Sequence, residues 1–411
     1  MNRLLLSAVV ALLSIPSWSQ PPVVQTGIDV LRDQKFAGLA GKRVGLITNP
    51  TGVDSRLRST IDILFNAPAV RVVALFGPEH GVRGDHAAGD PVGTFTDSAT
   101  GLPVYSLYGR TRKPTAEMLR GIDVLVYDIQ DIGCRSYTYI STMGLAMEAA
   151  AEQRIPFLVL DRPNPLGGIR MEGAPVRHGF ESFVSAHPIP YVYGLTCGEL
   201  ARMLNGEGLL AEGKRCSLTV VPMKGWKRDM TFSDTGLPWV PTSPHIPEPT
   251  TPAFYVSSGL LGELGVISEG VGYTLPFKVF AAPWINPKLL ADRMNSLGLP
   301  GVIFRPMALK PFNGRFKDTE LRGVQIHFTG NGPDDLMGLQ FRFMEIHNEL
   351  HPDKNPFTLA DPSRLAMFDR VAGSDSLRIL FTRRMKYGDV ADVLKQGVKE
   401  FRERSGRYRL Y

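Results

Sequence analysis

Three apolar runs in the sequence end in the same way, each giving way to a carboxylate side chain. The runs are residues 72–76, 123–127 and 157–160, and they are followed by Glu79, Asp128 and Asp161. An apolar run of this length, closed by a turn signal such as Gly77-Pro78, is typical of a buried strand. Parallel strands place their carboxyl ends at one edge of a sheet, where ligands bind. The sequence therefore predicts that these carboxylates converge on one site.

Strand and helix patterns alternate between residues 43 and 223. Further strands are expected at 43–48 and 218–221, and helices at 59–65, 114–120 and 136–152. Thr196 and Glu199, three residues apart ahead of an apolar run, form the capping box of another helix. The connections have the length that parallel crossovers need. This order predicts an α/β fold with a doubly wound, mostly parallel sheet.

A smaller second unit follows a break in this pattern. Residues 226–256 are rich in proline, which removes backbone donors and interrupts regular structure, so we expect an extended connection there. Beyond residue 283 the patterns predict helices at 287–297 and 335–350 and strands at 302–306 and 324–328. A last helix is expected to begin at Asp389, whose side chain can cap it. We therefore divide the chain into an N-terminal domain at 20–282 and a smaller α/β domain at 283–411.

The first 19 residues have the pattern of a secretory signal peptide. Asn2 and Arg3 precede an apolar run at 4–13, and small residues follow where a signal peptidase cuts, with cleavage expected after Ser19. The apolar run is too short to span a membrane, and no later stretch of the sequence reaches that length. The sequence thus predicts a periplasmic or secreted protein.

Cysteine content and charge narrow the classes of function. The three cysteines allow one disulfide at most in an oxidising compartment, and their spacing does not match a zinc site. The formal net charge of +6 is modest and spread along the chain, without the basic stripe that nucleic-acid binding requires. An acidic cell-surface ligand suits this charge better. The sequence also lacks the signatures of nucleotide-binding loops and of nucleophilic serines, so no cofactor is expected.

Glu79 is the first catalytic candidate. It lies with His80 in a tight Gly-Pro…Gly loop at a strand end, where perturbed acids occur; the alternative is that it only caps a helix or accepts backbone amides. Glu172, between Met171 and Gly173, is the second candidate and is expected to face Glu79 across the crevice. Glu269 is a third glutamate in a glycine-flanked loop.

Residues after the strand at 123–127 are candidates for substrate binding. Asp128 and Asp131 lie three apart in a strand-to-helix turn; the alternative for Asp131 is that it caps the helix and pairs with Arg135. Arg135 can form a bidentate hydrogen bond with a ligand carboxylate, and Tyr137 or Tyr139 can stack on a sugar face.

Two loops complete the predicted site. Asp161 and Asn164 belong to a rigid Asp-Arg-Pro-Asn loop. The alternative to substrate binding by Asp161 is a structural role within this loop. Residues 80–108 form a long loop rich in Gly, Asp and Thr, and loops of this length in a compact domain are often functional. We expect this loop to be a lid or a wall of the site.

Several carboxylates with tyrosines and tryptophans in the cleft of an exported protein fit glycoside hydrolysis. One carboxyl protonates the leaving oxygen while the other acts as nucleophile or base. A rival hypothesis is a metal-dependent hydrolase, because His80, Asp85, His86 and Asp90 lie close together in the sequence. Their spacing matches no specific metal signature. A non-catalytic binding protein is the third hypothesis.

At these same residues the chain resembles the bacterial NamZ-type exo-β-N-acetylmuramidases, a family long filed as a domain of unknown function. The resemblance rests on segments 45–52, 76–81, 127–131, 161–165 and 239–247, with Arg135, Tyr137 and Tyr139. The Glu-His loop and the Asp-Ile-Gln-Asp turn are specific when they occur together. His245 departs from the pattern, because a smaller amide is expected there.

The resemblance implies a Rossmann-like domain without a nucleotide, a smaller C-terminal α/β domain and a cleft between them. It implies release of N-acetylmuramic acid from the non-reducing end of peptidoglycan-derived muropeptides or disaccharides. The charge and hydropathy of the sequence add that neither a nucleic acid nor a membrane span is expected. Glu79 is then the acid/base, and Glu172 leads as second carboxylate, ahead of Glu269 and Asp128. Arg135 or Arg83 is expected to bind the lactyl carboxylate of the substrate. Inverting, retaining and acetamido-assisted routes all stay open.

Overall fold

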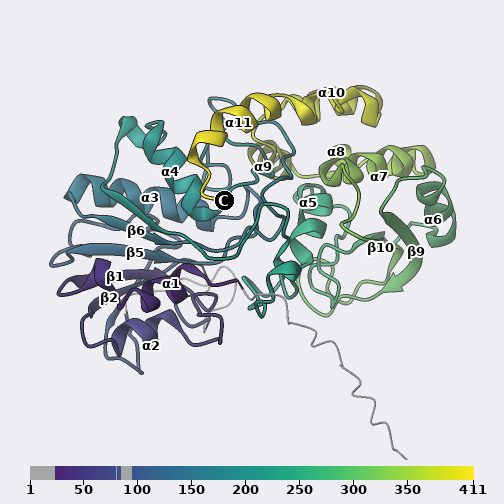
Figure 1. The fold of residues 1–411 in the computed structure, drawn as a ribbon. Helices are drawn as coiled ribbons and strands as arrows, with labels where there is room; N and C mark the ends of the chain where they lie inside the picture. Colours follow the sequence, from purple (N-terminus) through teal and green to yellow (C-terminus); the bar gives the residue numbers. More distant parts are fainter. Residues whose placement is uncertain (1–23, 80, 85–94) are drawn as a thin grey trace, which may run out of the picture.

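The computed structural model describes residues 24–79, 81–84 and 95–411. These residues form two lobes that lie side by side (Figure 1). The predicted signal peptide lies outside the described residues.

A seven-stranded sheet forms the centre of the N-terminal lobe. Its strands are β1 (Arg43–Thr48), β2 (Arg71–Gly77), β3 (Phe95–Thr96), β4 (Pro103–Ser106), β5 (Val124–Asp128), β6 (Phe157–Leu160) and β7 (Leu218–Val221). They lie in the order β3-β4-β2-β1-β5-β6-β7, and every neighbouring pair is parallel except β3 and β4. The predicted α/β fold with a mostly parallel sheet is confirmed.

Helices cover both faces of this sheet. They are α1 (Gly27–Asp33), α2 (Thr60–Phe65), α3 (Tyr139–Gln153) and α4 (Cys197–Gly206), with short 3-10 turns η1 (Ala37–Leu39), η2 (Ala211–Gly213) and η3 (Phe232–Thr235). In Figure 1, α3 and α4 lie above the sheet and α1 and α2 below it. Alternate side chains of each strand point to opposite faces. Leu46 therefore packs with α1 and α2, and its neighbour Ile47 packs with α3 and α4.

The C-terminal lobe is built around a small antiparallel sheet in the order β8-β10-β9. Its strands are β8 (Val279–Ala282), β9 (Val302–Leu309) and β10 (Leu321–Phe328). Its helices are α5 (Thr251–Gly262), α6 (Pro287–Asn295), α7 (Leu336–Leu350), α8 (Pro356–Leu359), α9 (Pro362–Ala372), α10 (Ser376–Arg384) and α11 (Val398–Ser405). The 3-10 turns are η4 (Pro352–Lys354), η5 (Tyr387–Asp389), η6 (Val393–Lys395) and η7 (Gly406–Tyr408).

The last segment of the chain returns to the N-terminal lobe. In Figure 1, α10 and α11 lie along the top of the molecule, above α9, and the C-terminus lies in the N-terminal lobe near α4. Arg202 of α4 donates to the carbonyls of Tyr408 and Arg409, and the Tyr411 hydroxyl donates to Asp161 at 2.7 Å. The two lobes are therefore joined by more than one chain connection.

The predicted domain boundary at 282/283 follows β8 directly. However, β8 pairs with β10, and α5 packs against α7, so both belong structurally with the later elements. We therefore propose a boundary near residue 251.

Three expected elements differ in the structure. Residues 114–120 form turns rather than a helix. The last helix does not begin at Asp389. Two 3-10 turns precede it, and Gly397, with a φ of 73°, has a non-helical conformation just before the helix begins at Val398. The loop expected at 80–108 contains β3 and β4, which are too short to leave a periodic pattern.

No helix among the described residues combines the length and the hydrophobicity that crossing a bilayer requires. Cys134, Cys197 and Cys216 are all buried free thiols. The disulfide that the cysteine count would allow is thus not formed.

Candidate active site

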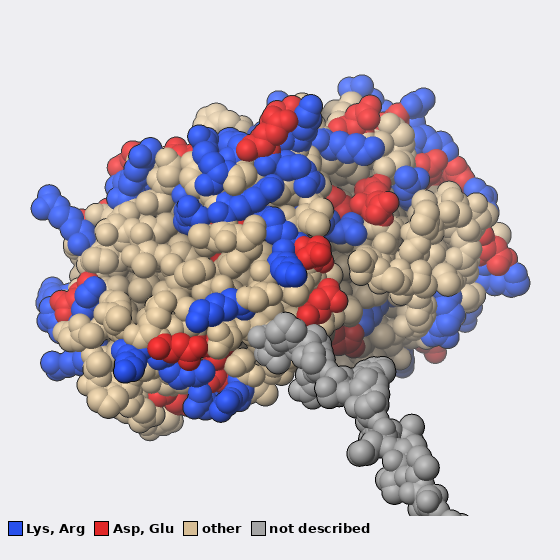
Figure 2. Space-filling model, viewed as in Figure 1, with Lys and Arg blue, Asp and Glu red and all other residues tan. Residues whose placement is uncertain are grey.

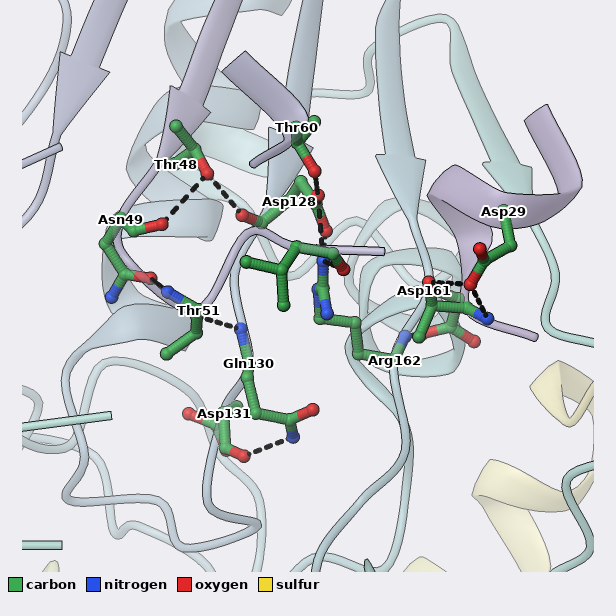
Figure 3. Close-up of polar contacts among 12 residues, drawn as sticks. Asp29, Thr48, Asn49, Thr51, Thr60, Asp128, Gln130, Asp131, Asp161 and Arg162 are labelled. Carbon is green, nitrogen blue, oxygen red and sulfur yellow. Dashed lines mark hydrogen bonds and ion pairs between the residues drawn. The ribbon is translucent and has the colours of Figure 1, made fainter. Parts of the chain in front are cut away.

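The carboxyl ends of four adjacent parallel strands bring the predicted residues to one edge of the sheet. In the order β2-β1-β5-β6, Glu79 and Asn49 follow β2 and β1, Asp128 is the last residue of β5, and Asp161 follows β6. The predicted convergence of strand ends is confirmed, and Figure 3 shows the loops after β1, β5 and β6 meeting there. The side chains at this edge differ in one important respect, which is whether their polar atoms already have partners.

Glu79 is partly exposed and lies next to two tyrosines. Burial, followed by the charge of Glu79 and a hydrogen bond to its carboxylate, raises the pKa of Tyr108 to about 12. The charge of Glu79 also contributes to the raised pKa of Tyr139, for which burial is the main cause. Tyr108 follows β4, in the stretch that sequence reasoning assigned to a loop. His80 lies outside the described residues.

Asn49 contributes a buried donor beside this group. Its side chain is 2% exposed, and its Oδ1 accepts from the backbone and hydroxyl of Thr51. Its Nδ2 has no hydrogen-bond partner within the described part of the chain. The amide also lies beside the Tyr139 hydroxyl, which donates to the carbonyl of Thr242. A buried amide without an acceptor is costly, so Asn49 is suited to donate to a ligand.

Asp128 is fully enclosed in an ion pair. Its carboxylate accepts from Arg162 Nε at 2.5 Å and Nη2 at 2.9 Å, and from the Thr60 hydroxyl at 2.5 Å (Figure 3). Arg162 also donates to the carbonyl of Val53. Because both oxygens are occupied and the side chain is 0% exposed, this arrangement favours a structural role for Asp128.

Asp131 has one occupied and one free oxygen. Its Oδ2 accepts from the amide of Gly133 and the hydroxyl of Tyr193, whereas Oδ1 has no partner among the described residues. Burial raises the pKa of Asp131 to about 7. The alternative expectation that Asp131 pairs with Arg135 is wrong, because the Arg135 guanidinium lies among backbone carbonyls instead.

Arg135 is completely buried and joins the two lobes. It donates to the carbonyls of Ala174 and Ile189 in one lobe and of Val371 and Ala372 at the end of α9 in the other. Burial lowers its pKa to about 10. A cation at the end of a helix also complements the helix dipole. The sequence suggested that this guanidinium makes a bidentate hydrogen bond with a ligand carboxylate. In the structure it is not available for this role.

Arg83, the other predicted cation, is also committed. It bonds to Asp97 at 2.6 Å and to Asp62 at 3.1 Å, and these carboxylates hold the pKa of its guanidinium above the usual range. Tyr137 donates to the hydroxyl of Thr242 at 2.8 Å. Tyr137 and Tyr139 thus both hold the proline-rich segment against the N-terminal lobe.

The loop after β6 is held internally. Asp161 accepts from the Thr196 hydroxyl, the Gly198 amide and the Tyr411 hydroxyl, and burial raises the pKa of Asp161 to about 6. Asn164 donates to the carbonyl of Leu195 and accepts from the amide of Leu166. Both side chains are placed to fix the loop, which is the alternative that the sequence offered for Asp161.

Glu172 lies between the lobes with both oxygens occupied. Oε1 pairs with Arg170 at 2.7 Å, and Oε2 accepts from the backbone amide of Met337 in the first turn of α7 at 2.9 Å. Burial raises its pKa above the usual range. These contacts favour a role in joining the lobes over a role in catalysis.

Glu269 has no such partners. It lies between α5 and β8, and within the described residues its carboxylate accepts only from its own backbone amide. Burial, and more weakly the nearby Glu263, raise the pKa of Glu269 to about 7. A carboxyl that keeps its proton near neutral pH is suited to general acid chemistry.

The four residues of the rival metal site lie outside the described part of the chain. His80, Asp85, His86 and Asp90 are all beyond the described ranges. Within those ranges, no group of three or more His, Cys, Asp or Glu side chains is placed to hold a metal ion.

The protein has two lobes, and unpaired acidic and amide groups lie at the carboxyl edge of its parallel sheet. These features define its class as a two-domain α/β enzyme. Comparison with known proteins identifies the family. The family model "Exo-beta-N-acetylmuramidase NamZ, N-terminal" matches residues 44–250, and its C-terminal counterpart matches residues 253–411. The chain belongs to the NamZ family of exo-β-N-acetylmuramidases and is a glycosidase.

Individual relatives agree with this assignment. The chain is 43% identical over 393 residues to the peptidoglycan β-N-acetylmuramidase NamZ of Bacillus subtilis, covering 96% of this chain and 92% of that protein. Two crystal structures of DUF1343 family proteins from Bacteroides fragilis are also similar. One is 58% identical with a TM-score of 0.91, covering 95% of this chain and all of that one. The other is 28% identical with a TM-score of 0.76, covering 95% and 99%.

Proposed function

We propose that this protein is an exported enzyme that releases N-acetylmuramic acid from the non-reducing end of peptidoglycan fragments. The observation that carries the proposal is the position of Glu79, a partly exposed carboxylate at the sheet edge, beside Tyr108, Tyr139 and an unpaired Asn49 amide. The Bacillus subtilis relative is named for activity on peptidoglycan, which supports this class of substrate.

Glu79 is the acid/base of the proposed reaction. A general acid must reach the glycosidic oxygen, and Glu79 keeps access to solvent while the Tyr108 hydroxyl fixes its orientation. Asn49 supplies a preformed donor for an oxygen of the bound sugar, because its Nδ2 is buried without an acceptor. Since the protein donor is already desolvated, a substrate acceptor completes the hydrogen bond at little further cost.

Glu172, Glu269 and Asp128 are the candidates for the second carboxylate. Asp128 spends its oxygens on Arg162 and the Thr60 hydroxyl, and Glu172 on Arg170 and a backbone amide. Glu269 has no side-chain partner in the described residues, but burial raises its pKa to about 7, which disfavours the ionised form that a nucleophile or base requires. Inverting, retaining and acetamido-assisted routes stay open, and the first two differ in how far apart the carboxyl groups lie.

The experiment is hydrolysis of a chromogenic muramide by the mature protein, with and without EDTA. We expect release of the chromophore, with a rate that EDTA leaves unchanged, since the proposed chemistry uses carboxylates alone. Inactivation by EDTA that added metal restores would favour the metal-dependent hydrolase. Binding of the muramide without any release would favour a binding protein.

A further inference from the structure

The two arginines that the sequence suggested for the lactyl carboxylate are already used inside the protein. Arg135 is buried among backbone carbonyls, and Arg83 pairs with two aspartates. Figure 2 shows acidic and basic side chains close together along the border between the lobes. Recognition of an anionic substrate therefore needs an individual cation that no carboxylate of the protein neutralises.

Arg112 is such a cation, in the loop that follows β4. The adjacent Lys113 pairs with Glu148 and Glu152 of α3. Arg112 itself is exposed and pairs with no carboxylate among the described residues. Its guanidinium lies over the ring of Phe183, 4.4 Å from the ring centre. This contact covers one face of the guanidinium and leaves the N–H donors at its edge free for a ligand carboxylate.

The pairing of β2 with β4 places this loop beside Glu79. The two strands are parallel and end in register at Gly77 and Ser106, and the amide of Leu107 donates to the carbonyl of Gly77 at 2.7 Å. Loops that leave adjacent parallel strands emerge at the same edge of the sheet. Tyr108, the next residue, therefore reaches Glu79 and forms a hydrogen bond with its carboxylate.

The same tyrosine lies close enough to Arg112 to sense its charge. Burial and the charge of Glu79 raise the pKa of Tyr108 to about 12, and the charge of Arg112 opposes that rise. Glu79 and Arg112 thus both act on one hydroxyl, although they form no ion pair with each other. A carboxyl group and a cation arranged in this way can contact different substituents of one bound sugar.

N-acetylmuramic acid carries its charge away from the bond that is cleaved. The glycosidic oxygen is on C1, where Glu79 donates its proton in the proposed reaction. The lactyl ether, with its carboxylate, is on C3. N-acetylglucosamine, with which muramic acid alternates in peptidoglycan, has only a hydroxyl on C3. A cation that is near the acid but not paired with it therefore distinguishes these sugars.

We propose that Arg112 binds the lactyl carboxylate of N-acetylmuramic acid through a bidentate hydrogen bond and so determines the specificity of the enzyme for this sugar. The inference rests on the proposed function and deepens it. Phe183 is a positioning residue, because its ring holds the guanidinium and so reduces the side-chain freedom that is lost on binding. Arg112 takes the role that the sequence suggested for Arg135 or Arg83.

Isothermal titration calorimetry with free N-acetylmuramic acid and with its methyl ester tests this assignment, because the ester presents the same sugar without the charge. Wild-type protein is expected to bind the acid about tenfold more tightly than the ester. Arg112→Gln should bind both ligands with the affinity of the ester. Arg110→Gln is the matched control, since it removes another exposed cation of the same loop, and it should keep the preference for the acid.

The role of the aromatic ring is tested with Phe183→Leu. Loss of the cation–π contact should reduce the preference for the acid about threefold, while the affinity for the ester stays unchanged. A variant that binds both ligands equally less tightly would refute the positioning role, because a general structural defect does not depend on the charge of the ligand.

Three outcomes would overturn the assignment of Arg112. They are no binding of the acid by folded wild-type protein, equal binding of acid and ester by the wild type, and a full preference for the acid in Arg112→Gln. The assay contains no glycosidic bond, so failure of the proposed hydrolysis would leave these results unaffected. Hydrolysis of a chromogenic muramide by Arg112→Gln with the kcat/KM of the wild type would refute this assignment alone.

Discussion

The guanidinium of Arg135 donates five hydrogen bonds inside the protein, to the Ser185 hydroxyl and to four backbone carbonyls from both lobes. From the sequence alone, the same arginine is a plausible ligand for a substrate carboxylate. The difference arises because its partners come from residues 174–189 and 371–372, which no local pattern connects to it. At the scale of residues, the candidate site is therefore defined by which polar atoms remain unpaired.

Replacing this guanidinium tests its structural role. Arg135→Lys keeps the charge but can make at most three hydrogen bonds, so buried carbonyls lose their donors. We expect a loss of about 2–4 kcal/mol in the free energy of unfolding. Urea denaturation measures this, with the exposed Arg110→Lys as control. An unchanged urea midpoint would show that the buried contacts of Arg135 contribute little.

The raised pKa of Asp131 predicts how the stability of the protein depends on pH. Its pKa is raised by burial from 3.8 to about 7 in the folded protein. Between these values the unfolded chain has released the proton while the folded chain retains it, so stability falls as pH rises. We expect Asp131→Asn to flatten the pH dependence of the urea midpoint between about pH 4 and pH 7. Parallel curves for the variant and the wild type would refute the assigned protonation.

At the scale of elements, Glu172 acts on a helix of the other lobe. Its Oε2 accepts from the first-turn amide of Met337 in α7, where a carboxylate also complements the positive end of the helix dipole. It reaches α7 from the loop after β6. This contact explains why a glutamate placed near the cleft by sequence is not free for chemistry.

The corresponding variant separates structure from catalysis. Glu172→Gln keeps the shape of the side chain but weakens the pair with Arg170 and the interaction with the helix. We expect a loss of about 1–2 kcal/mol in stability with kcat on a chromogenic muramide within about twofold of wild type. If kcat fell about 100-fold in a variant as stable as wild type, Glu172 would be catalytic after all.

Local patterns were sufficient for the strongly periodic elements. Apolar runs predicted β1, β6 and β7 to the residue, and the Thr196–Glu199 capping box predicted the start of α4. The sequence did not predict β3 and β4, because two- and four-residue strands carry no period. It predicted that strand ends converge, since topology alone requires this. It did not predict which carboxylates are used, because Arg162 and Thr60 approach Asp128 from distant segments.

At the scale of the whole molecule, the lobes are joined by Arg135, by Glu172 and by the returning C-terminal segment. Tyr411 donates to Asp161, and Leu410 donates to Glu199, so residues beyond α11 are held by the N-terminal lobe.

These ties predict cooperative unfolding. Differential scanning calorimetry of the mature protein should show one transition, because neither lobe can open without exposing partners buried in the other. Tyr411→Phe removes the bonds of the hydroxyl to Asp161 and to the Met223 amide, and should lower the transition temperature without splitting the peak. Two resolved transitions in the wild type would mean that the lobes unfold independently.

The decisive measurement is release of free N-acetylmuramic acid from a muramic-acid-terminated disaccharide. Wild-type protein and Glu79→Gln are compared, with Glu117→Gln as control at an exposed glutamate far from the sheet's carboxyl edge. We expect release by wild type and by the control, and a loss of about 100-fold or more in kcat/KM for Glu79→Gln. Wild-type rates in a correctly folded Glu79→Gln variant would contradict the assignment of Glu79 as the acid/base.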